Sequence, residues 1–422
     1  MPTAMVLSQG DEVVTGQITD TNAAWLSAQL TERGFTVLRH VTVGDRLDDL
    51  VVVFRALSGV CDLCVCTGGL GPTDDDLTAP AVAAAFDRPQ ELDPVALAQV
   101  KERFARFGRP MAAVNERQAW LPRGVTRLDN DWGTAPGFAF QEGQAFFACL
   151  PGVPREMRKM FPLRVMPLVS ARIPLQPGRL VTLRCIGVGE SDLQQALGDF
   201  SAPGVVVSFR TKLPENHLKL RIGPEVSAAA VQAAVADVYG RVGRWVFTVQ
   251  GAEVAGVDNS GGSHPAVVGS ALEAAGHTLA IAESCTGGRA AAAVTAVPGA
   301  SAWFLEGLVT YANAAKVRLL GVEENMLAQH GAVSEPVARQ MAAGVRERAG
   351  STWGIGITGL AGPGGATPDK PVGTVHVAID GPGGATHRAL RLPGDRGRVQ
   401  ELSVAAALEL LRRRLLSPPT LA

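Results

Sequence analysis

Hydrophobic positions in the first third of the chain alternate between the spacing of strands and the spacing of helices. Ala23, Leu26 and Leu30 recur on one helical face, whereas the apolar runs before and after them alternate or are continuous, as in buried strands. The expected elements are strands at 4–8, 35–43 and 61–66, and helices that end at Gly34 and Gly59. This β-α-β-α-β order predicts a parallel three-layer sheet whose ligands lie beyond the carboxyl ends of its strands.

The rest of the chain follows two further patterns. Residues 178–250 read as β-α-β-β-α-β, the split βαβ arrangement, and predict a small separate domain. Residues 251–264 (GAEVAGVDNSGGSH) are rich in Gly, Ser and Asn and predict a flexible linker. From Pro265 onward, helices and strands alternate again as a second α/β unit. The expected division is 1–170, 171–250, linker 251–264 and 265–422.

Charge and apolar content argue against two classes, nucleic-acid-binding proteins and membrane proteins. The chain has 422 residues, too many for one ordinary core, and a formal net charge of −1, which argues against a nucleic-acid-binding footprint. The middle segment also lacks a GxxG clamp loop and a basic stripe, so a spacer or dimerising role is favoured there over direct nucleic-acid binding. Without a long apolar run or a signal peptide pattern, we expect a cytoplasmic protein that does not enter a membrane.

The cysteines predict packing rather than chemistry. Six cysteines are few for this length, so a disulfide framework is not expected. The stretch CDLCVC at 61–66 offers a metal-binding interpretation, but a tetrahedral zinc site needs a second ligand cluster that the sequence does not supply. Buried strand cysteines are therefore expected there.

A glycine-rich acidic loop follows the third predicted strand. In TGGLGPTDDDLT, residues 67–78, glycines allow backbone N–H groups to approach a phosphate, and three successive aspartates offer the oxygen ligands that divalent cations prefer. A glycine-rich turn with a solvated acidic helix start is the alternative, because Asp favours helix N-termini for capping alone. The residues themselves leave both interpretations open.

The stretch AESCTGG, residues 282–288, places two candidate nucleophiles, Ser284 and Cys285, between a strand and a helix-like run. Free N–H groups at such a helix start favour an oxyanion. A catalytic cysteine usually needs a histidine partner, and none of the histidines after residue 260 is singled out by its spacing. A catalytic serine needs a base, which a lysine of lowered pKa can provide.

Such a lysine lies in TYANAAKVRLLGV, residues 310–322. If Asn313 caps the helix, Lys316 falls in the first turn, where the helix dipole disfavours its protonated form. An exposed helical lysine without a catalytic role is the alternative. Thr358 ends a buried strand before a Gly/Pro-rich loop, and either Arg396 or Arg398 could hold a phosphate.

Several long motifs together resemble one family, the CinA proteins, named for competence and damage induction. They are GDEVVTGQITDTNAAWL, TGGLGPTDDDLT, GTAPGF, LPGVPREM, GVGESDL, AESCTGG, TYANAAKVRLLGV and ITGLAGPGGATPDKPVGTV, and they cover nearly the whole chain. The resemblance implies an α/β protein in three parts: a three-layer molybdopterin-binding-like domain, a small KH-like domain and a C-terminal α/β amidase domain.

The resemblance implies that the C-terminal domain hydrolyses nicotinamide mononucleotide (NMN) to nicotinate mononucleotide and ammonia, without a cofactor, in pyridine nucleotide salvage. The implied nucleophile is Ser284 and its base is Lys316, with Tyr311 and Thr358 orienting the pair. Cys285 is then a packed neighbour. Further substrate-binding residues are Thr286, Gly287 and Gly288, whose N–H groups would stabilise the oxyanion, and Arg398, which would clamp the phosphate.

For the N-terminal domain the resemblance implies cleavage of ADP-ribose to AMP and ribose 5-phosphate with a divalent cation, Mg, Mn or Co. The phosphate loop is carried over as Thr67, Gly68, Gly69 and Gly71. The carboxylates expected at the cation are Asp76, Asp45 and Glu12.

Two readings of another class remain beside the enzyme. One is an interaction protein in competence or DNA repair that binds a protein partner such as a recombinase. The other is a protein whose N-terminal domain binds a molybdopterin-type ligand without cleaving a pyrophosphate. By resemblance alone we expect a homodimer.

Overall fold

The structure is a computed structural model that describes residues 1–416. The chain forms two compact units, residues 1–179 and the chain from residue 180 onward, which are described separately. Within residues 1–416, no helix combines the length and apolarity that a membrane span requires.

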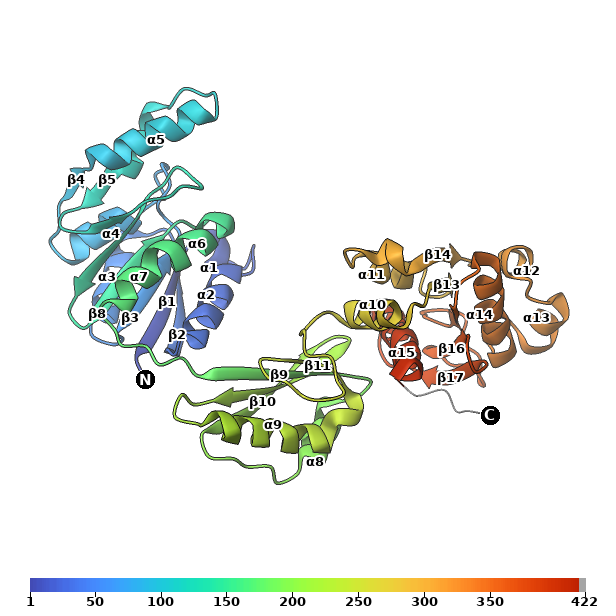
Figure 1. Ribbon diagram of the computed structural model, residues 1–422. Helices are drawn as coiled ribbons and strands as arrows, with labels where there is room; N and C mark the ends of the chain where they lie inside the picture. The colour runs from blue at the N-terminus through green and yellow to red at the C-terminus, as the bar shows by residue number, and fades with distance from the viewer. Residues whose placement is uncertain (417–422) are drawn as a thin grey trace. The chain divides into compact units, whose positions relative to one another are not determined.

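The first unit is built on a six-stranded sheet in the order β2-β1-β3-β8-β7-β6 (Figure 1). Its strands are β1 (Thr3–Gln9), β2 (Thr36–Val43), β3 (Leu63–Thr67), β6 (Thr126–Leu128), β7 (Gly137–Glu142) and β8 (Ala145–Leu150). The predicted parallel sheet is correct for β2, β1, β3 and β8. It is wrong at the other edge, where β7 pairs antiparallel with both β8 and β6. The reason is a two-residue turn between β7 and β8, in which Gly143 takes φ +55°.

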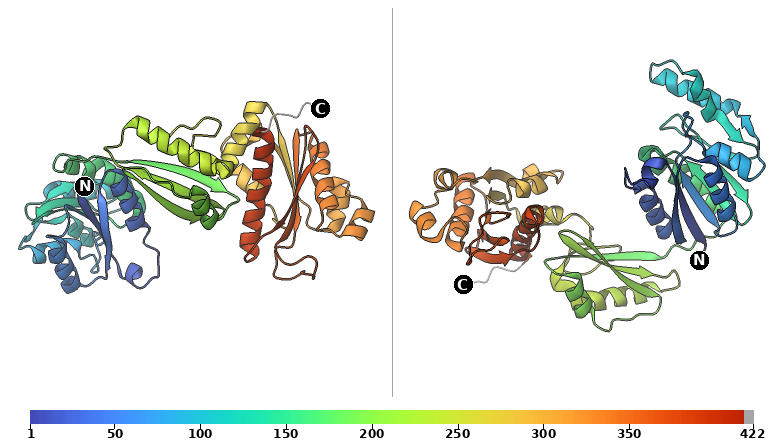
Figure 2. Two further views of the ribbon diagram at one scale, coloured as in Figure 1. Left: turned by 90° about the horizontal axis from the view of Figure 1, so that it is seen from below. Right: turned by 180° about the vertical axis from the view of Figure 1, so that it is seen from behind.

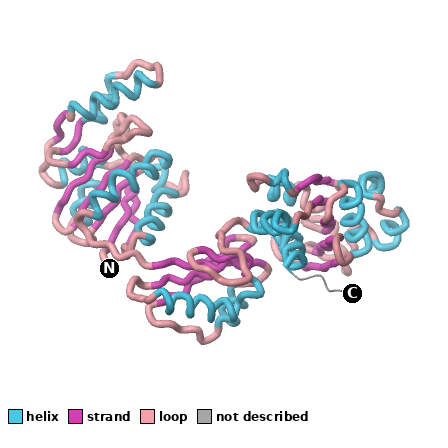
Figure 3. The backbone as a smooth tube through the Cα atoms, viewed as in Figure 1, coloured by secondary structure: helices cyan, strands magenta, loops and turns pink. Residues whose placement is uncertain are grey.

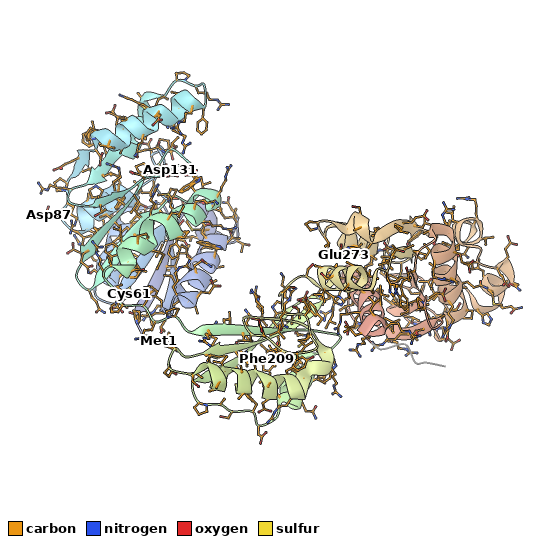
Figure 4. The ribbon with its side chains drawn as sticks, viewed as in Figure 1. Met1, Cys61, Asp87, Asp131, Phe209 and Glu273 are labelled. Atoms are coloured by element: carbon orange, nitrogen blue, oxygen red, sulfur yellow. The ribbon has the colours of Figure 1, made fainter. Side chains whose placement is uncertain are left out.

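Helices cover both faces of this sheet, as the three-layer prediction required. Alternate residues of β1 point to opposite sides: Met5 and Leu7 into one buried cluster, Ala4 and Val6 into the other. Cys61, labelled in Figure 4, belongs to the first cluster, and so do Cys64, Cys66 and Cys149. The unit's remaining elements are α1 (Asp11–Val14), α2 (Thr21–Glu32), α3 (Leu47–Leu57), α4 (Thr78–Ala85), β4 (Gln90–Leu92), α5 (Pro94–Arg106), η1 (Ala113–Ala119), β5 (Trp120–Pro122), α6 (Pro154–Met160), η2 (Phe161–Val165) and α7 (Met166–Ser170).

The second unit begins with the predicted split βαβ domain. Its elements are β9 (Arg179–Ile186), α8 (Glu190–Leu197), β10 (Val205–Lys212), β11 (Glu215–Ile222), α9 (Ala228–Val242), η3 (Gly243–Trp245) and β12 (Val246–Gln250). The sheet order is β10-β11-β9-β12, and both longer helices lie on one face of it (Figure 3). One buried cluster between sheet and helices forms its core.

The stretch 251–264 is not the flexible linker that its composition predicted. Its residues fold back on β12, because the Val249 N–H donates to Asp258 O (2.8 Å) and the Thr248 hydroxyl donates to the Asp258 carboxylate (2.5 Å). The Arg184 guanidinium donates to Gly261 O and Gly262 O at 2.8 and 2.6 Å. The backbone carbonyls of Asp258, Gly261 and Gly262 therefore accept hydrogen bonds from β9 and β12, where a flexible linker would leave them to solvent.

The last domain contains a five-stranded sheet in the order β14-β13-β15-β16-β17. The central β13 is parallel to β14 and β15, and β16 and β17 continue antiparallel. Figure 2 shows α15 and α12–α14 on opposite sides of this sheet. The elements are α10 (His264–Ala275), β13 (Leu279–Glu283), α11 (Arg289–Thr295), η4 (Ala300–Ala302), β14 (Phe304–Val309), α12 (Asn313–Leu320), α13 (Glu324–His330), α14 (Glu335–Ala349), β15 (Trp353–Gly359), β16 (Thr374–Asp380), β17 (Thr386–Arg391) and α15 (Arg396–Leu416).

Candidate active site

Three neighbouring parallel strands end together in the last domain. Glu283, the last residue of β13, lies opposite Val309 of β14 and Ile357 of β15. The segments that follow these strands therefore meet at one edge of the sheet, the usual place for a ligand in an α/β fold. The residues delivered there include Ser284, Tyr311 and Thr358.

Lys316 reaches this edge from α12 and contacts Ser284. Its Nζ lies 3.2 Å from Ser284 Oγ, 2.8 Å from Thr310 O and 3.2 Å from Tyr311 O. Carbonyl oxygens can only accept, so two N–H bonds of the amine are directed to the backbone. In the neutral amine the remaining position is a lone pair, and it faces the Ser284 hydroxyl. The arrangement suits proton transfer from Ser284 to Lys316.

The environment of Lys316 favours that neutral form. The side chain is 1% exposed, and burial lowers its pKa below the usual lysine value. The expected cap is wrong, because Asn313 is the first residue of α12 and Ala312 occupies the cap without a side-chain hydrogen bond. Lys316 still lies in the first turn, but the helix dipole is not the main cause of its lowered pKa. Desolvation is the main cause instead.

A buried carboxylate shapes the turn after Ser284. The Glu283 side chain is fully buried, and it accepts hydrogen bonds from the N–H groups of Gly288 (3.1 Å), Ala290 (3.0 Å) and Ala291 (2.8 Å). It therefore satisfies the free N–H groups at the start of α11. Sequence reasoning missed this role, although an acidic residue at a strand end, six residues before the first residue of a helix, was the available signal.

This carboxylate changes the expected oxyanion site. The Gly288 N–H donates to Glu283, and the Gly287 N–H donates to Ser284 O at 3.2 Å, so neither is free for a substrate. The Cys285 N–H is directed at its own thiol, whereas within residues 1–416 the Thr286 N–H has no acceptor. Of the three predicted donors, Thr286 alone keeps a free N–H.

Cys285 lies in the hydrophobic core rather than at the reacting edge. It is 4% exposed and packs in the cluster between the sheet and α15. Burial raises the pKa of its thiol to about 12, so the thiolate that nucleophilic attack needs is disfavoured.

The remaining predicted residues divide into those at the site and those away from it. Arg396 donates to the Tyr311 hydroxyl (3.1 Å) and to Gly362 O (2.8 Å). Arg398, the predicted clamp, instead folds its side chain over Gly394 and makes no hydrogen bond to these groups in residues 1–416. The Thr358 hydroxyl donates to Ala332 O at 2.7 Å, so it braces the strand end rather than the Ser284–Lys316 pair.

A second candidate site lies in the first unit. A cleft of about 420 Å³ is lined by the glycine loop, Gly68, Gly69 and Gly71, and by the three predicted carboxylates, Glu12, Asp45 and Asp76. The loop packs tightly, since a Cβ on Gly69 would lie 2.1 Å from Gln9 Oε1. Thr67 lies in an adjoining cavity, and its hydroxyl donates to Pro151 O.

The carboxylates of this cleft do not form a metal cage. Asp76 accepts from the N–H groups of Gly71 (2.7 Å) and Thr73 (2.8 Å), and Asp45 accepts from Gln9 Nε2 and the Asp11 N–H, both at 2.9 Å. Within residues 1–416, no group of three or more His, Cys, Asp or Glu could hold a metal ion. The donor set fits a cation held by one or two carboxylates with a ligand's phosphate oxygens and water, as Mg²⁺ often is.

Comparison with known proteins covers nearly the whole chain. Residues 263–415 match the family described as "CinA C-terminal domain", and residues 5–171 match the "Probable molybdopterin binding domain" family. A CinA-like protein of Anaeromyxobacter sp. (strain Fw109-5) is 45% identical over 96% of this chain and 98% of its own length. A CinA-like protein of Geobacter metallireducens is 41% identical over 99% of this chain and 100% of its own length. The crystal structure of the competence/damage inducible protein CihA from Agrobacterium tumefaciens is 38% identical, covering 36% of this chain and 94% of that one, with a TM-score of 0.36.

Proposed function

This chain belongs to the CinA family, and on that premise we propose that its C-terminal domain is an amidase that converts NMN to nicotinate mononucleotide and ammonia. One observation carries the proposal. The Lys316 amine is buried, and its Nζ lies 3.2 Å from Ser284 Oγ while two backbone carbonyls take its other positions. A nucleophile and its base are thus already in contact.

The reaction proceeds in two halves. Lys316 takes the Ser284 proton as Oγ attacks the carboxamide carbon, and the free N–H group of Thr286 is the donor available to the oxyanion. Lys316 then gives its proton to the departing nitrogen, which leaves as ammonia, and an ester remains on Ser284. Water attacks this ester with Lys316 again as base, which releases the carboxylate product and restores the serine.

Arg396 replaces Arg398 as the proposed phosphate ligand. Its guanidinium lies at the same edge of the sheet and is held there by the Tyr311 hydroxyl and Gly362 O. An arginine presents several donors in a fixed plane, which suits a phosphate. Binding energy from the phosphate would hold the carboxamide against Ser284.

Ammonia release from NMN in the presence of EDTA tests the amidase. Wild type and Cys285→Ala are expected to turn over, and Ser284→Ala to lose about 10⁴-fold or more in kcat. Loss of activity in Cys285→Ala with activity retained in Ser284→Ala would refute the Ser–Lys assignment. In the same assay Arg396→Gln should raise KM, and the matched variant Arg398→Gln should leave KM near that of wild type.

For the N-terminal domain we propose hydrolysis of ADP-ribose to AMP and ribose 5-phosphate. The supporting observation is the cleft that both glycines and carboxylates line. A bound divalent cation would neutralise phosphate charge there, and one or two of the Glu12, Asp45 and Asp76 carboxylates would hold it together with the phosphate oxygens. The backbone N–H groups of the loop would orient the pyrophosphate.

AMP release from ADP-ribose, measured with Mg²⁺, Mn²⁺ or Co²⁺, tests this second activity. Gly69→Val is expected to abolish it, because the added side chain would occupy the space of Gln9 Oε1. Ser284→Ala should leave it unchanged. Absence of AMP release with all three metals would leave the fold as a ligand-binding domain, and inactivity of both domains would favour a competence or repair interaction protein.

A further inference from the structure

Helix α15 presents two polar side chains to the candidate active site. Arg396 and Gln400 are four residues apart and so lie on the same helical face. Arg396 donates to the Tyr311 hydroxyl, as described above. Gln400 is 8% exposed, and its Nε2 donates to the carbonyl of Cys285 at 2.7 Å.

The orientation of the Gln400 amide is fixed from its other side. Arg289 Nε donates to Gln400 Oε1 at 3.0 Å. An arginine can only donate and a backbone carbonyl can only accept, so the amide has one orientation that satisfies both partners. Gln400 of α15 is therefore hydrogen-bonded both to α11, through Arg289, and to the turn after Ser284, through the Cys285 carbonyl.

The carbonyl that Gln400 holds belongs to the peptide between Cys285 and Thr286. This peptide is trans, and in a planar trans peptide the C=O and N–H groups point in opposite directions. A carbonyl held toward α15 therefore directs the Thr286 N–H away from α15. That N–H has no acceptor within residues 1–416, whereas the next two N–H groups of the turn are already used.

We infer that Gln400 is a positioning residue for the amidase reaction: it sets the Cys285–Thr286 peptide so that the Thr286 N–H is available to the developing oxyanion. The inference rests on the proposed amidase function. Within residues 1–416, Gln400 has no hydrogen bond to Ser284 or Lys316, so we assign its effect to the peptide it holds. Its contribution belongs to the transition state, because the oxyanion is absent from the bound substrate.

Two variants of the full chain test this role. Gln400→Met keeps the length of the side chain and removes both hydrogen bonds. Gln400→Glu keeps the acceptor for Arg289 and places an oxygen against the Cys285 carbonyl, so it carries the test if Gln400→Met fails to fold. Ser403→Ala is the matched control, since Ser403 is buried in the same helix and its hydroxyl donates only to Val399 O.

Two rates are measured: NMN turnover, and labelling of Ser284 by a fluorophosphonate, which also forms an oxyanion-like centre but needs no nicotinamide. Both Gln400 variants are expected to lower kcat and the labelling rate roughly 10- to 100-fold, with KM within about twofold and the pH midpoint unchanged. Ser403→Ala should retain both rates.

Three results would overturn the inference: rates within about twofold of wild type in both variants, a rise in KM at constant kcat, or an equal loss in Ser403→Ala. The two readouts also separate this inference from the proposed function. Labelling of wild-type Ser284 without NMN turnover would refute NMN as the substrate, while the labelling rates of the Gln400 variants would still decide the role of Gln400.

Discussion

At the scale of single residues, the site depends on a lysine kept where its charge is unfavourable. Lys316 is almost fully buried among backbone carbonyls and Ser284, and no carboxylate is hydrogen-bonded to it within residues 1–416. Burial without a counter-ion favours the neutral amine, which is the form that can accept a proton. Burial lowers the pKa of Lys316, and a lower pKa gives more of the neutral amine that the proposed base needs.

This environment sets the direction of the pH dependence. The NMN rate should rise as Lys316 loses its proton and reach a plateau below the usual lysine pKa of about 10.4, because burial lowers the pKa of this group. The measurement is kcat/KM for NMN from pH 5 to 11. A rate that falls as pH rises through neutrality would contradict a lysine base.

At the scale of elements, the side chain of Glu283, the last residue of β13, holds the turn between β13 and α11 by hydrogen bonds. Glu283 binds three N–H groups around the start of α11, and the two glycines before the helix take φ of +61° and +95°. Only residues without a Cβ adopt such angles readily. The proposed nucleophile, Ser284, thus lies on a turn held by Glu283 from β13 and by Gln400 from α15.

Replacing Glu283 by Gln should destabilise the last domain. The amide offers one acceptor oxygen where the carboxylate offered two, and it adds donors next to N–H groups, so we expect a loss of about 1–3 kcal/mol in unfolding free energy. Calorimetry of the full chain should show the transition of this domain at a lower Tm. The exposed Glu324, in the first turn of α13, supplies the control: Glu324→Gln should change Tm little. Equal Tm values for the two variants would refute the role assigned to Glu283.

At the scale of the whole molecule, the second unit is braced by an ion cluster on its longest helix. Glu409 of α15 accepts from Arg412 at 2.7 and 2.9 Å and from Arg413 at 2.7 Å, and His264 of α10 lies 3.3 Å away. Burial alone would raise the pKa of Glu409, but the hydrogen bonds from His264 and Arg412 outweigh it and lower the pKa to about 2. The charged carboxylate therefore stabilises the fold.

The sign of this shift predicts how the protein responds to acid. Because the folded pKa lies below the unfolded value of about 4.3, the stabilisation is complete above that value and is lost as pH falls toward 2. Glu409→Gln should cost about 3 kcal/mol at pH 7. Its difference from wild type should shrink between pH 4 and pH 2 in denaturant titrations. A difference independent of pH would contradict the assignment.

Much of this arrangement follows from the order of residues along the chain. Apolar periodicity predicted the layered sheets and the split βαβ order, and the strand-turn-helix pattern at 282–288 predicted a nucleophile at a helix start. The pairing of that nucleophile with Lys316 came only from the family resemblance. The antiparallel edge was missed because the β-α-β-α-β pattern behind the prediction ends at residue 66, before the hairpin of β7 and β8. The fold-back of 251–264 was missed because composition does not reveal which carbonyls Arg184 reaches.

The choice between Arg396 and Arg398 could not be made from sequence either. The two residues are separated by one position, and only the start of α15 decides which of them faces Tyr311. Glu283 and Gln400 escaped notice for a related reason. Their roles consist of hydrogen bonds to backbone groups. Every residue carries such groups, so the sequence does not show which of them is the partner.

The burial of Cys285 has a consequence for the protein under oxidative stress. Burial raises the pKa of this thiol to about 12, which disfavours the thiolate at pH 7, and the thiolate is the form that reacts with peroxides and alkylating reagents. The proposed amidase would attack through the neighbouring Ser284 hydroxyl, so sulfenic acid formation would not remove its nucleophile, and the buried Cys285 thiol would react slowly with the oxidant. Such an enzyme would keep working as peroxide accumulates, when thiol-dependent hydrolases are silenced.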